Sequence, residues 1–340
     1  MPDPLSVDSP RPELAAAVPF LTIAIPTYNR AEALDTTLAI LVPQLDAAVR
    51  LVVIDNASTD DTRSVCRRHR EAGVPLEIIR NPLNIGADAN IMRGCEQAGE
   101  GYLWILPDDD LPDAKAIATI RSVIRVHPDV DYINFHTTLL DRSGIARRSE
   151  RLVRSAEAFV EALDSFGNLL FLTAGVYRAG FVKAWIIQGH EAIVTCGPSI
   201  AMVLQAIGRG EASVLFTPAS IATWGVFPTW DIQRVCRAVY RLIELLPAGA
   251  VRRRFALKLL ADFPPRLWSS SDLRGILKAA ADGEAALMAA QERYRIAAAY
   301  QSRSIPALML VVALRGAAPL GALALISRLR NAHIARRRRR

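Results

Sequence analysis

Three adjacent aspartates are the feature of this sequence that most directly suggests chemistry. Asp108, Asp109 and Asp110 follow Pro107 at the end of an apolar run, residues 101–106. Three carboxylates placed together repel one another, and a hard divalent cation removes that repulsion. Mg²⁺ usually binds one or two carboxylates and takes its other oxygen ligands from water and substrate phosphates. The triplet therefore predicts a Mg²⁺ or Mn²⁺ site. The alternative is a solvated acidic turn that opens the next helix.

Two further segments contain residue types that suit a nucleotide. PTYNR, residues 26–30, offers backbone amides, the aromatic ring of Tyr28 and the cation of Arg30. If it stood alone, this segment would be interpreted as an ordinary strand-to-helix turn. VIDNASTD, residues 53–60, contains Asp55, whose carboxylate could accept hydrogen bonds from a base or a ribose.

A fourth polar segment, NIGADAN at residues 84–90, has a glycine between polar side chains. Gly86 permits close approach of the backbone to a ligand. Its neighbours Asn84 and Asp88 could orient phosphates or a ribose. The sequence therefore offers four candidate segments for one anionic, nucleotide-like ligand.

Short apolar runs alternate with amphipathic stretches over residues 21–135, which predicts alternating strands and helices. Ser58 or Thr59 is expected to cap the second helix. Alternation of this kind favours a mostly parallel, doubly wound α/β sheet, whose ligands bind beyond the carboxyl ends of the strands. All four polar segments are predicted at that edge. The expected strands are Leu21–Ile25, Val49–Ile54, Leu76–Ile79, Tyr102–Leu106 and Val130–Phe135, and the expected helices are Arg30–Leu41, Thr59–Ala72, Gly86–Ala98 and Asp113–Val126.

The ordered set PTYNR, VIDNASTDDT, NPLNIGADAN and DDD resembles family 2 glycosyltransferases of the GT-A fold. The resemblance covers roughly residues 20–135. Within that family, N-x-G-x-D-x-N followed by a strand that contains Trp104 and ends in DDD is similar to the abequosyltransferase-like branch of bacterial surface-polysaccharide enzymes.

This resemblance implies a metal-dependent, inverting transfer of a sugar from a nucleotide-sugar donor to a glycan or lipid-linked acceptor. It implies that Pro26, Thr27 and Tyr28 contact the nucleoside, and that Asp55 binds the base or ribose. It also implies that Asp108 lies near the ribose or donor sugar, with Asp109 or Asp110 on the metal.

An inverting transfer also needs a base on the acceptor side of the donor sugar, and the family places this carboxylate well downstream of the metal motif. Glu191 follows Gly189 and His190 and precedes the apolar residues 192–194. That setting predicts a desolvated carboxylate with a raised pKa. A loop glutamate without a role explains the same pattern, and Asp231 is the second candidate.

The remaining sequence suggests four regions. We expect a flexible leader at 1–19 and a GT-A domain at 20–230, with a nucleotide-sugar half (20–135) and an acceptor half (136–230). A helical C-terminal region is expected at 231–304, and apolar segments with a polybasic tail at 305–340. Two other enzyme classes fit less well. The first loop lacks the G-x-G-x-x-G of dinucleotide-binding oxidoreductases and the Gly- and Lys-rich loop of sugar-phosphate nucleotidyltransferases. A non-catalytic nucleotide-sugar or membrane-associated scaffold remains an alternative.

The net charge of +7 equals the seven arginines between Arg328 and Arg340, so the body of the chain is neutral and no nucleic-acid partner is expected. Arg315, Gly316 and Pro319 interrupt the apolar stretch 305–326. Two segments lying on an anionic membrane surface fit this pattern better than a span, although a packed terminal helix also fits. Together with cysteines that form no C-x-x-C pair, these features favour a cytoplasmic protein, peripheral on the cytoplasmic face of the inner membrane.

Deleting residues 328–340 should move the protein from anionic vesicles to the soluble fraction while catalysis on a soluble acceptor continues. Each arginine near such a surface contributes about 1 kcal/mol, so seven suffice for salt-sensitive attachment. Vesicle sedimentation at low and high salt measures this. Equal sedimentation of the full-length and truncated proteins at both salt concentrations would contradict the prediction.

Overall fold

The computed structural model describes residues 20–137, 149–223 and 238–262. The predicted leader, the apolar segments, the polybasic tail and Asp231 lie outside the described residues. So does most of the predicted helical C-terminal region.

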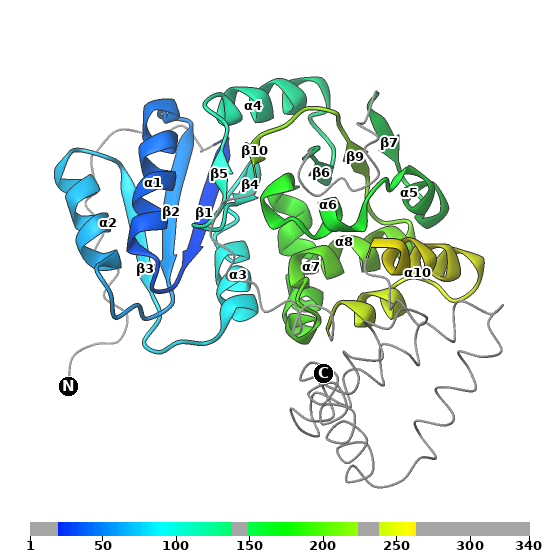
Figure 1. The fold of residues 1–340 in the computed structure, drawn as a ribbon. Coiled ribbons are helices and arrows are strands. Elements are labelled where there is room, and N and C mark those ends of the chain that lie inside the picture. The colour runs from blue at the N-terminus through cyan, green and yellow to red at the C-terminus, as the bar shows by residue number, and fades with distance from the viewer. Residues whose placement is uncertain (1–19, 138–148, 224–237, 263–340) are drawn as a thin grey trace, which may run out of the picture.

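A single eight-stranded sheet runs through the described residues in the order β3-β2-β1-β4-β8-β6-β9-β7 (Figure 1). Strands β3, β2, β1 and β4 are mutually parallel, whereas β8 is antiparallel to both β4 and β6. The mostly parallel sheet predicted from the sequence is therefore confirmed. Its strands are β1 (Leu21–Thr27), β2 (Val49–Asp55), β3 (Leu76–Arg80), β4 (Tyr102–Ile105), β6 (Tyr132–Asn134), β7 (Arg151–Val153), β8 (Gly175–Arg178) and β9 (Val214–Phe216), and a small second sheet pairs β5 (Leu111–Pro112) with β10 (Ala222–Thr223).

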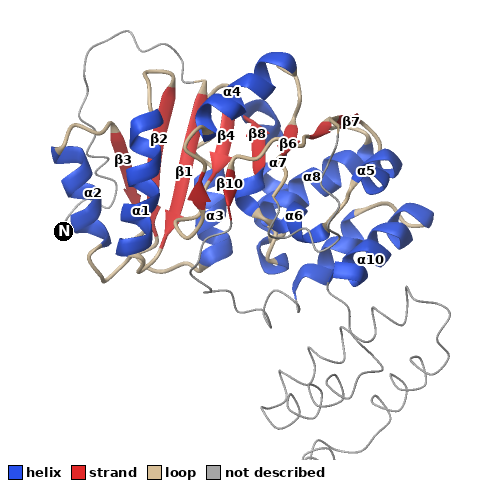
Figure 2. Ribbon diagram, turned by 45° about the horizontal axis from the view of Figure 1, so that its top comes forward, coloured by secondary structure: helices blue, strands red, loops and turns tan. Residues whose placement is uncertain are grey.

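Helices cover both faces of the sheet (Figure 2). Helices α1, α2 and α4 pack on one face, and α3, α5, α6, α7, α8 and α10 pack on the other. In Figure 1 helices α1 and α2 lie beside β1–β3, and α5, α6 and α10 gather at the other end of the sheet. The helices are α1 (Ala31–Leu41), α2 (Thr62–Glu71), α3 (Ala87–Cys95), α4 (Ala116–Val126), α5 (Ala156–Ala162), α6 (Phe166–Leu170), α7 (Ala179–Glu191), α8 (Pro198–Arg209) and α10 (Ala250–Asp262), with 3₁₀ turns η1 (Val42–Gln44), η2 (Leu172–Ala174), η3 (Ile193–Thr195) and η4 (Val239–Leu245).

Alternation along the strands explains why the sheet needs two layers of helices. In β1, Leu21, Ile23 and Ile25 join the core under α1 and α4, whereas Ala24 faces the core under α3. All seven residues of β1 are buried. A strand that is apolar on both faces is typical of a central parallel strand covered on each side. Each fully buried aliphatic side chain contributes about 1.5–3 kcal/mol.

The start of α2 differs from the prediction. The helix begins at Thr62, whose backbone amide donates to Asp60 Oδ1 at 3.1 Å, and neither Ser58 nor Thr59 caps it. Ser58 instead accepts a hydrogen bond from the amide of Asn29 in the neighbouring loop. The predicted cap was wrong because the Ser58 hydroxyl bonds to the neighbouring loop and not to the start of α2.

The sequence of residues 136–180 mixes polar and apolar segments with few clear periods, and the elements that it forms are short. Helices α5 and α6 have seven and five residues and are capped by Ser155 and Ser165, whose hydroxyls accept from the amides of Ala158 and Asn168. Elements this short complete too few turns to set up a recognisable period. None of the helices in the described part of the chain combines the length and apolar character that a membrane-spanning segment requires.

Candidate active site

The four polar segments meet at one edge of the sheet. Thr27, Asp55 and Arg80 are the last residues of β1, β2 and β3, and Asp55 is the register partner of both Thr27 and Arg80. On the other side of β1, the amide of Leu106 donates to the carbonyl of Ala24 at 3.0 Å, so the chain beyond β4 emerges next to the end of β1. The predicted placement of all four segments at the carboxyl ends of the strands is thus observed.

One guanidinium group bridges two carboxylates of the acidic triplet. Arg30 Nη1 lies 2.8 Å from Asp108 Oδ1 and 2.9 Å from Asp109 Oδ2. Both aspartates are buried, at 2% and 7% exposure, whereas the Arg30 side chain is 28% exposed. Buried carboxylates require a countercharge, and the described structure provides it from the loop between β1 and α1.

The environment of Asp108 raises the pKa of its carboxyl group to about 6. Burial is the main cause, and the positive charge of Arg30 and the hydrogen bond from Thr27 oppose it. The Thr27 hydroxyl donates to Asp108 Oδ2 at 2.6 Å. Asp108 is therefore fastened on both oxygens, one to β1 and one to Arg30.

Asp110 points to a different partner. Its Oδ2 accepts a hydrogen bond from the Thr173 hydroxyl, and the Thr173 carbonyl accepts from Trp104 Nε1 at 2.8 Å. The Thr37 hydroxyl of α1 lies within hydrogen-bond distance of the Asp108 and Asp110 carbonyls, at 3.1 and 3.2 Å. The turn that carries the triplet is therefore held from α1 on one side and from η2 on the other.

Asp55 is buried, at 1% exposure, and both its oxygens are bonded within the protein. Oδ1 accepts from the amide of Ser58 at 2.8 Å, and Oδ2 accepts from Arg80 Nη1. Arg80 Nη2 also donates to the Ser58 carbonyl at 2.9 Å. Asp55 thus shapes the loop after β2, and Arg80, with a side chain 35% exposed, is the more accessible member of the pair.

The loops after β1 and β2 are joined by hydrogen bonds, and we refer to them as the clasped loops. Asn29 donates from its amide to Ser58 Oγ at 3.0 Å and accepts from the amide of Thr59 at 2.7 Å. Asn29 and Ala57 both have positive φ, 52° and 62°, which costs a non-glycine residue about 1–2 kcal/mol. Pro26 is buried in β1, and the clasp leaves Tyr28 exposed at 41% beside it, where its ring is accessible to a ligand.

The loop before α3 contains the last predicted group. Asn84 Oδ1 accepts from the amide of Gly86 and from Asn56 Nδ2, both at 2.8 Å. Gly86 has φ 87°, a conformation that favours glycine. Asp88 is buried in the first turn of α3. All three residues lie at the predicted edge, with the Asn84 side chain bonded inside its own loop.

The carboxylates of this site fit a divalent cation. Asp108 Oδ1 and Asp109 Oδ2 already share one cationic nitrogen, and hard oxygen donors are the ligands that Mg²⁺ and Mn²⁺ prefer. Three or more His, Cys, Asp or Glu side chains do not converge anywhere in the described residues. One or two carboxylates suffice for a cation that also binds substrate phosphates. Asp109 fits as a ligand, and the structure groups it with Asp108 more closely than with Asp110.

The setting predicted for Glu191 is wrong. Glu191 is exposed and ends α7; it does not lie in a desolvated loop. Its neighbour His190 contacts Glu96, the residue directly after α3. The carbonyl of the following residue, Gln97, accepts a hydrogen bond from Arg50 near the start of β2. These contacts place this end of α7 toward the amino ends of the strands, away from Asp109. The apolar residues after Glu191 predicted burial, but the side chain at the helix end points to solvent.

Several site residues were missed by the sequence analysis. Thr37 carried a signal, because it is a polar residue on the apolar face of α1 beside Leu34 and Leu38. Arg80 directly follows an expected strand end, which is also a recognisable position. Thr173 lies in the segment without periodicity, and no sequence feature singles it out.

A family model described as "Glycosyl transferase family 2" matches residues 22–183. The matched region contains the Arg30-bridged acidic pair, the clasped loops and the sheet from β1 to β8. Residues 22–183 therefore match glycosyl transferase family 2, in agreement with the resemblance drawn from the sequence.

Curated relatives match over shorter stretches. Validoxylamine A glucosyltransferase from Streptomyces hygroscopicus subsp. jinggangensis is 45% identical over 62 residues, 18% of this chain and 15% of that protein. Glycosyltransferase AglE from Haloferax volcanii is 30% identical over 101 residues, 29% of this chain and 33% of that protein. The chain thus spans a third or less of the length of these two relatives.

Solved structures share the fold over most of the chain. S. aureus TarS 1-349 in complex with UDP-GlcNAc superposes with a TM-score of 0.59 at 15% identity, covering 87% of both chains. Mannosyltransferase PcManGT from Pyrobaculum calidifontis, in complex with GDP-Man and Mn2+, gives 0.53 at 18% identity and covers 92% of this chain and 84% of that one. At these identities the likeness establishes the GT-A-like fold.

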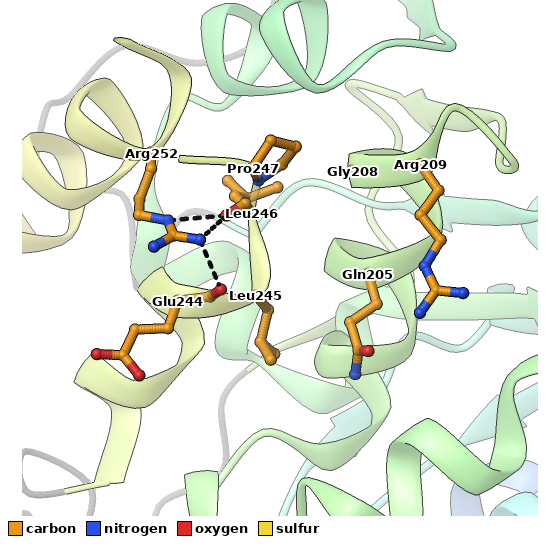
Figure 3. A pocket seen from close by; sticks show the side chains of 8 residues that line it. All are labelled: Gln205, Gly208, Arg209, Glu244, Leu245, Leu246, Pro247 and Arg252. Atoms are coloured by element: carbon orange, nitrogen blue, oxygen red, sulfur yellow. Dashed lines mark hydrogen bonds between the residues drawn. The ribbon is translucent and has the colours of Figure 1, made fainter. Parts of the chain in front are cut away.

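A hollow of about 250 Å³ lies elsewhere, between α8, η4 and α10 (Figure 3). Arg252 lines it and donates from Nε to the Leu246 carbonyl at 2.8 Å and from Nη2 to the Glu244 carbonyl at 3.0 Å. This guanidinium satisfies carbonyl groups at the end of η4. The hollow is therefore part of the packing of the C-terminal elements.

Replacing Arg30, which bridges Asp108 and Asp109, should destabilise the metal-free protein. In EDTA, Arg30→Gln should lower the free energy of unfolding by about 2 kcal/mol, less than the 3–5 kcal/mol of a fully buried pair because Arg30 is partly exposed. Mn²⁺ should restore more stability to this variant than to the wild type. Urea unfolding measures both quantities.

Arg121→Gln is the matched control, because its partner Asp46 is 48% exposed. That variant should lose no more than about 1 kcal/mol. Equal losses in the two variants would show that Arg30 is not the countercharge of a buried pair.

Proposed function

We propose that this protein is a glycosyltransferase that uses Mg²⁺ or Mn²⁺. It would move a sugar from a nucleoside-diphosphate sugar to a hydroxyl group of a glycan or lipid-linked acceptor. The observation that carries the proposal is the Arg30-bridged pair Asp108 and Asp109 at the carboxyl edge of a family 2 domain.

The residues of the site have distinct roles in this proposal. A bound divalent cation would stabilise the negative charge that develops on the departing diphosphate. Asp109, with Asp108 or Asp110, would hold that cation, and Thr27 and Thr37 would keep the acidic turn in place. Arg30 is partly exposed and lies beside both carboxylates, so its guanidinium can also face the diphosphate.

The nucleoside would lie across the clasped loops. Tyr28 presents an exposed ring there, and Arg80 is the accessible cation over Asp55. Aromatic faces and guanidinium groups suit stacking on a base. Pro26 and Thr27 would line the same pocket, and its far wall would be formed by the loop that Asn84 and Gly86 shape, together with Asp88.

The acceptor half and the cellular role are proposals from the sequence. A role in cell-surface polysaccharide synthesis, with inversion at the anomeric carbon, follows from the family resemblance. Attachment to the cytoplasmic face of a membrane follows from the arginine tail. The competing functions are a non-catalytic nucleotide-sugar binder and a sugar-phosphate nucleotidyltransferase. The first would bind donors without turnover, and the second would form a nucleotide sugar from a sugar phosphate and a nucleoside triphosphate.

Neutralising the acidic triplet should abolish transfer while the fold persists. Asp109→Asn is expected to lower kcat by about 10²–10³-fold, because an electrostatic group that stabilises developing charge is removed. Asp110→Asn should lose less, since an amide oxygen can still accept from Thr173. Initial rates with UDP-, dTDP-, GDP- and CDP-sugars, with and without EDTA, measure the effect.

Asp46→Asn serves as the control, because Asp46 also pairs with an arginine but is exposed and lies outside the site. Its rate should match that of the wild type. Full activity of the wild type in EDTA, or of an Asp109→Asn and Asp110→Asn double variant, would refute the metal-dependent mechanism.

The base is proposed to be Asp231, since the structure places Glu191 on the surface. Asp231→Asn should reduce kcat by about 10²–10⁴-fold, the usual cost of losing a general base. Glu191→Gln should stay within a few-fold of wild type. A reversed ranking of the two variants would reinstate Glu191.

A further inference from the structure

The side chain of Asn56 connects the loops that surround the proposed donor site. Asn56 directly follows β2 and is 2% exposed. Its Oδ1 accepts from Asn81 Nδ2 at 2.9 Å and from the amide of Ile85 at 3.0 Å. Its Nδ2 donates to Asn84 Oδ1 at 2.8 Å and to the Gly86 carbonyl at 3.4 Å. One carboxamide therefore makes four hydrogen bonds, which is its full capacity.

The network extends from Asn56 into α3. Asn81 Nδ2 also donates to Asn90 Oδ1 at 2.8 Å, and Asn90 Nδ2 donates to the Ile54 carbonyl at 3.0 Å. Asn81 and Asn90 are each 3% exposed. The network is built from neutral amides, so it fixes geometry without adding charge next to the acidic pair. Fully satisfied buried networks of this kind rigidify the backbone that they connect.

Packing does not hold the loop formed by residues 82–86. Its three apolar side chains are exposed: Pro82, Leu83 at 59% and Ile85 at 37%. Apolar burial therefore contributes little to holding this loop in place. The hydrogen bonds of Asn56 with the Ile85 amide and the Gly86 carbonyl hold it instead. The backbone amide of Asn56 donates to the Thr27 carbonyl at 2.9 Å. The hydroxyl of Thr27 also binds Asp108, so Asn56 is attached to the same residue of β1 that holds the acidic turn.

We propose that Asn56 is a positioning residue that sets the loop 82–86 as one wall of the nucleoside-diphosphate site. Asn84 helps to hold that loop in place and does not contact the ligand. Its Oδ1 is bonded to Asn56 Nδ2 and to the Gly86 amide. This inference rests on the proposed function, because it assumes that a nucleoside diphosphate binds at this edge.

A double-mutant cycle tests the proposal. Titration calorimetry gives the Kd for UDP and for GDP in Mn²⁺ for the wild type, Asn56→Ala, Asn84→Ala and the double variant. Asn56→Ala should raise the Kd about tenfold, because the loop would have to be ordered on binding without the hydrogen bonds that Asn56 supplies. Because both residues act through one fastening, the double variant should bind within about twofold of Asn56→Ala.

A second readout does not depend on ligand. Amide hydrogen exchange should become faster at Ile85 and Gly86 in Asn84→Ala, since the Gly86 amide loses its acceptor and the Asn56 bond is weakened. Asn84 is exposed, so this variant should fold even if Asn56→Ala does not.

Asn168→Ala is the matched control. Asn168 is 1% exposed, and its Nδ2 donates to Asn134 Oδ1 and to the Phe135 carbonyl at the end of β6, away from the loop 82–86. It should lower Tm without changing the Kd. Additive effects of Asn56→Ala and Asn84→Ala, or an unchanged Kd in Asn56→Ala, would overturn the inference and leave the proposed function intact. A wild type that binds no nucleoside diphosphate would overturn both.

Discussion

A single guanidinium between two buried carboxylates is the interaction on which this site depends. Asp108 and Asp109 lie in the turn that follows the central strand β4, where both are buried, and a carboxylate buried without a partner costs several kcal/mol. Arg30 supplies a countercharge from the loop after the neighbouring strand, β1. The ion pairs therefore join the segments that follow the adjacent strands β1 and β4, which links the chemistry of the site to the topology of the sheet.

The remaining contacts at this edge keep that arrangement in register. Thr27 and Thr37 fasten the turn from β1 and α1, and the clasp between Asn29 and Ser58 fixes the loop that presents Arg30. The carboxylate oxygens at this edge are hard donors of the kind that Mg²⁺ and Mn²⁺ prefer. Sites of this kind tolerate backbone strain, and the positive φ angles of Asn29 and Ala57 lie in the two clasped loops.

Much of the sheet could be predicted from the sequence. Strands that helices cover on both faces consist of continuous apolar runs, such as Leu21–Ile25, and polar segments follow these runs. The carboxyl edge followed from parallel topology. Side-chain partners did not follow, since they join residues distant in sequence: Thr173 reaches Asp110 over 63 positions. Glu191 was misplaced because apolar neighbours predict burial of a segment, not the direction of one side chain. Asn84 matched a ligand-binding motif, and its bonds to Asn56 and Gly86 became visible only in three dimensions.

In the proposed mechanism, the Arg30-bridged carboxylates hold a divalent cation against the diphosphate of a nucleotide-sugar donor. Anomalous diffraction from crystals grown with Mn²⁺ and UDP or GDP tests it most directly. We expect one Mn²⁺ peak at bonding distance, about 2.1 Å, from a carboxylate oxygen of Asp109 and in contact with the diphosphate. A nucleotide bound at this edge without Mn²⁺, or a Mn²⁺ peak away from residues 108–110, would contradict it.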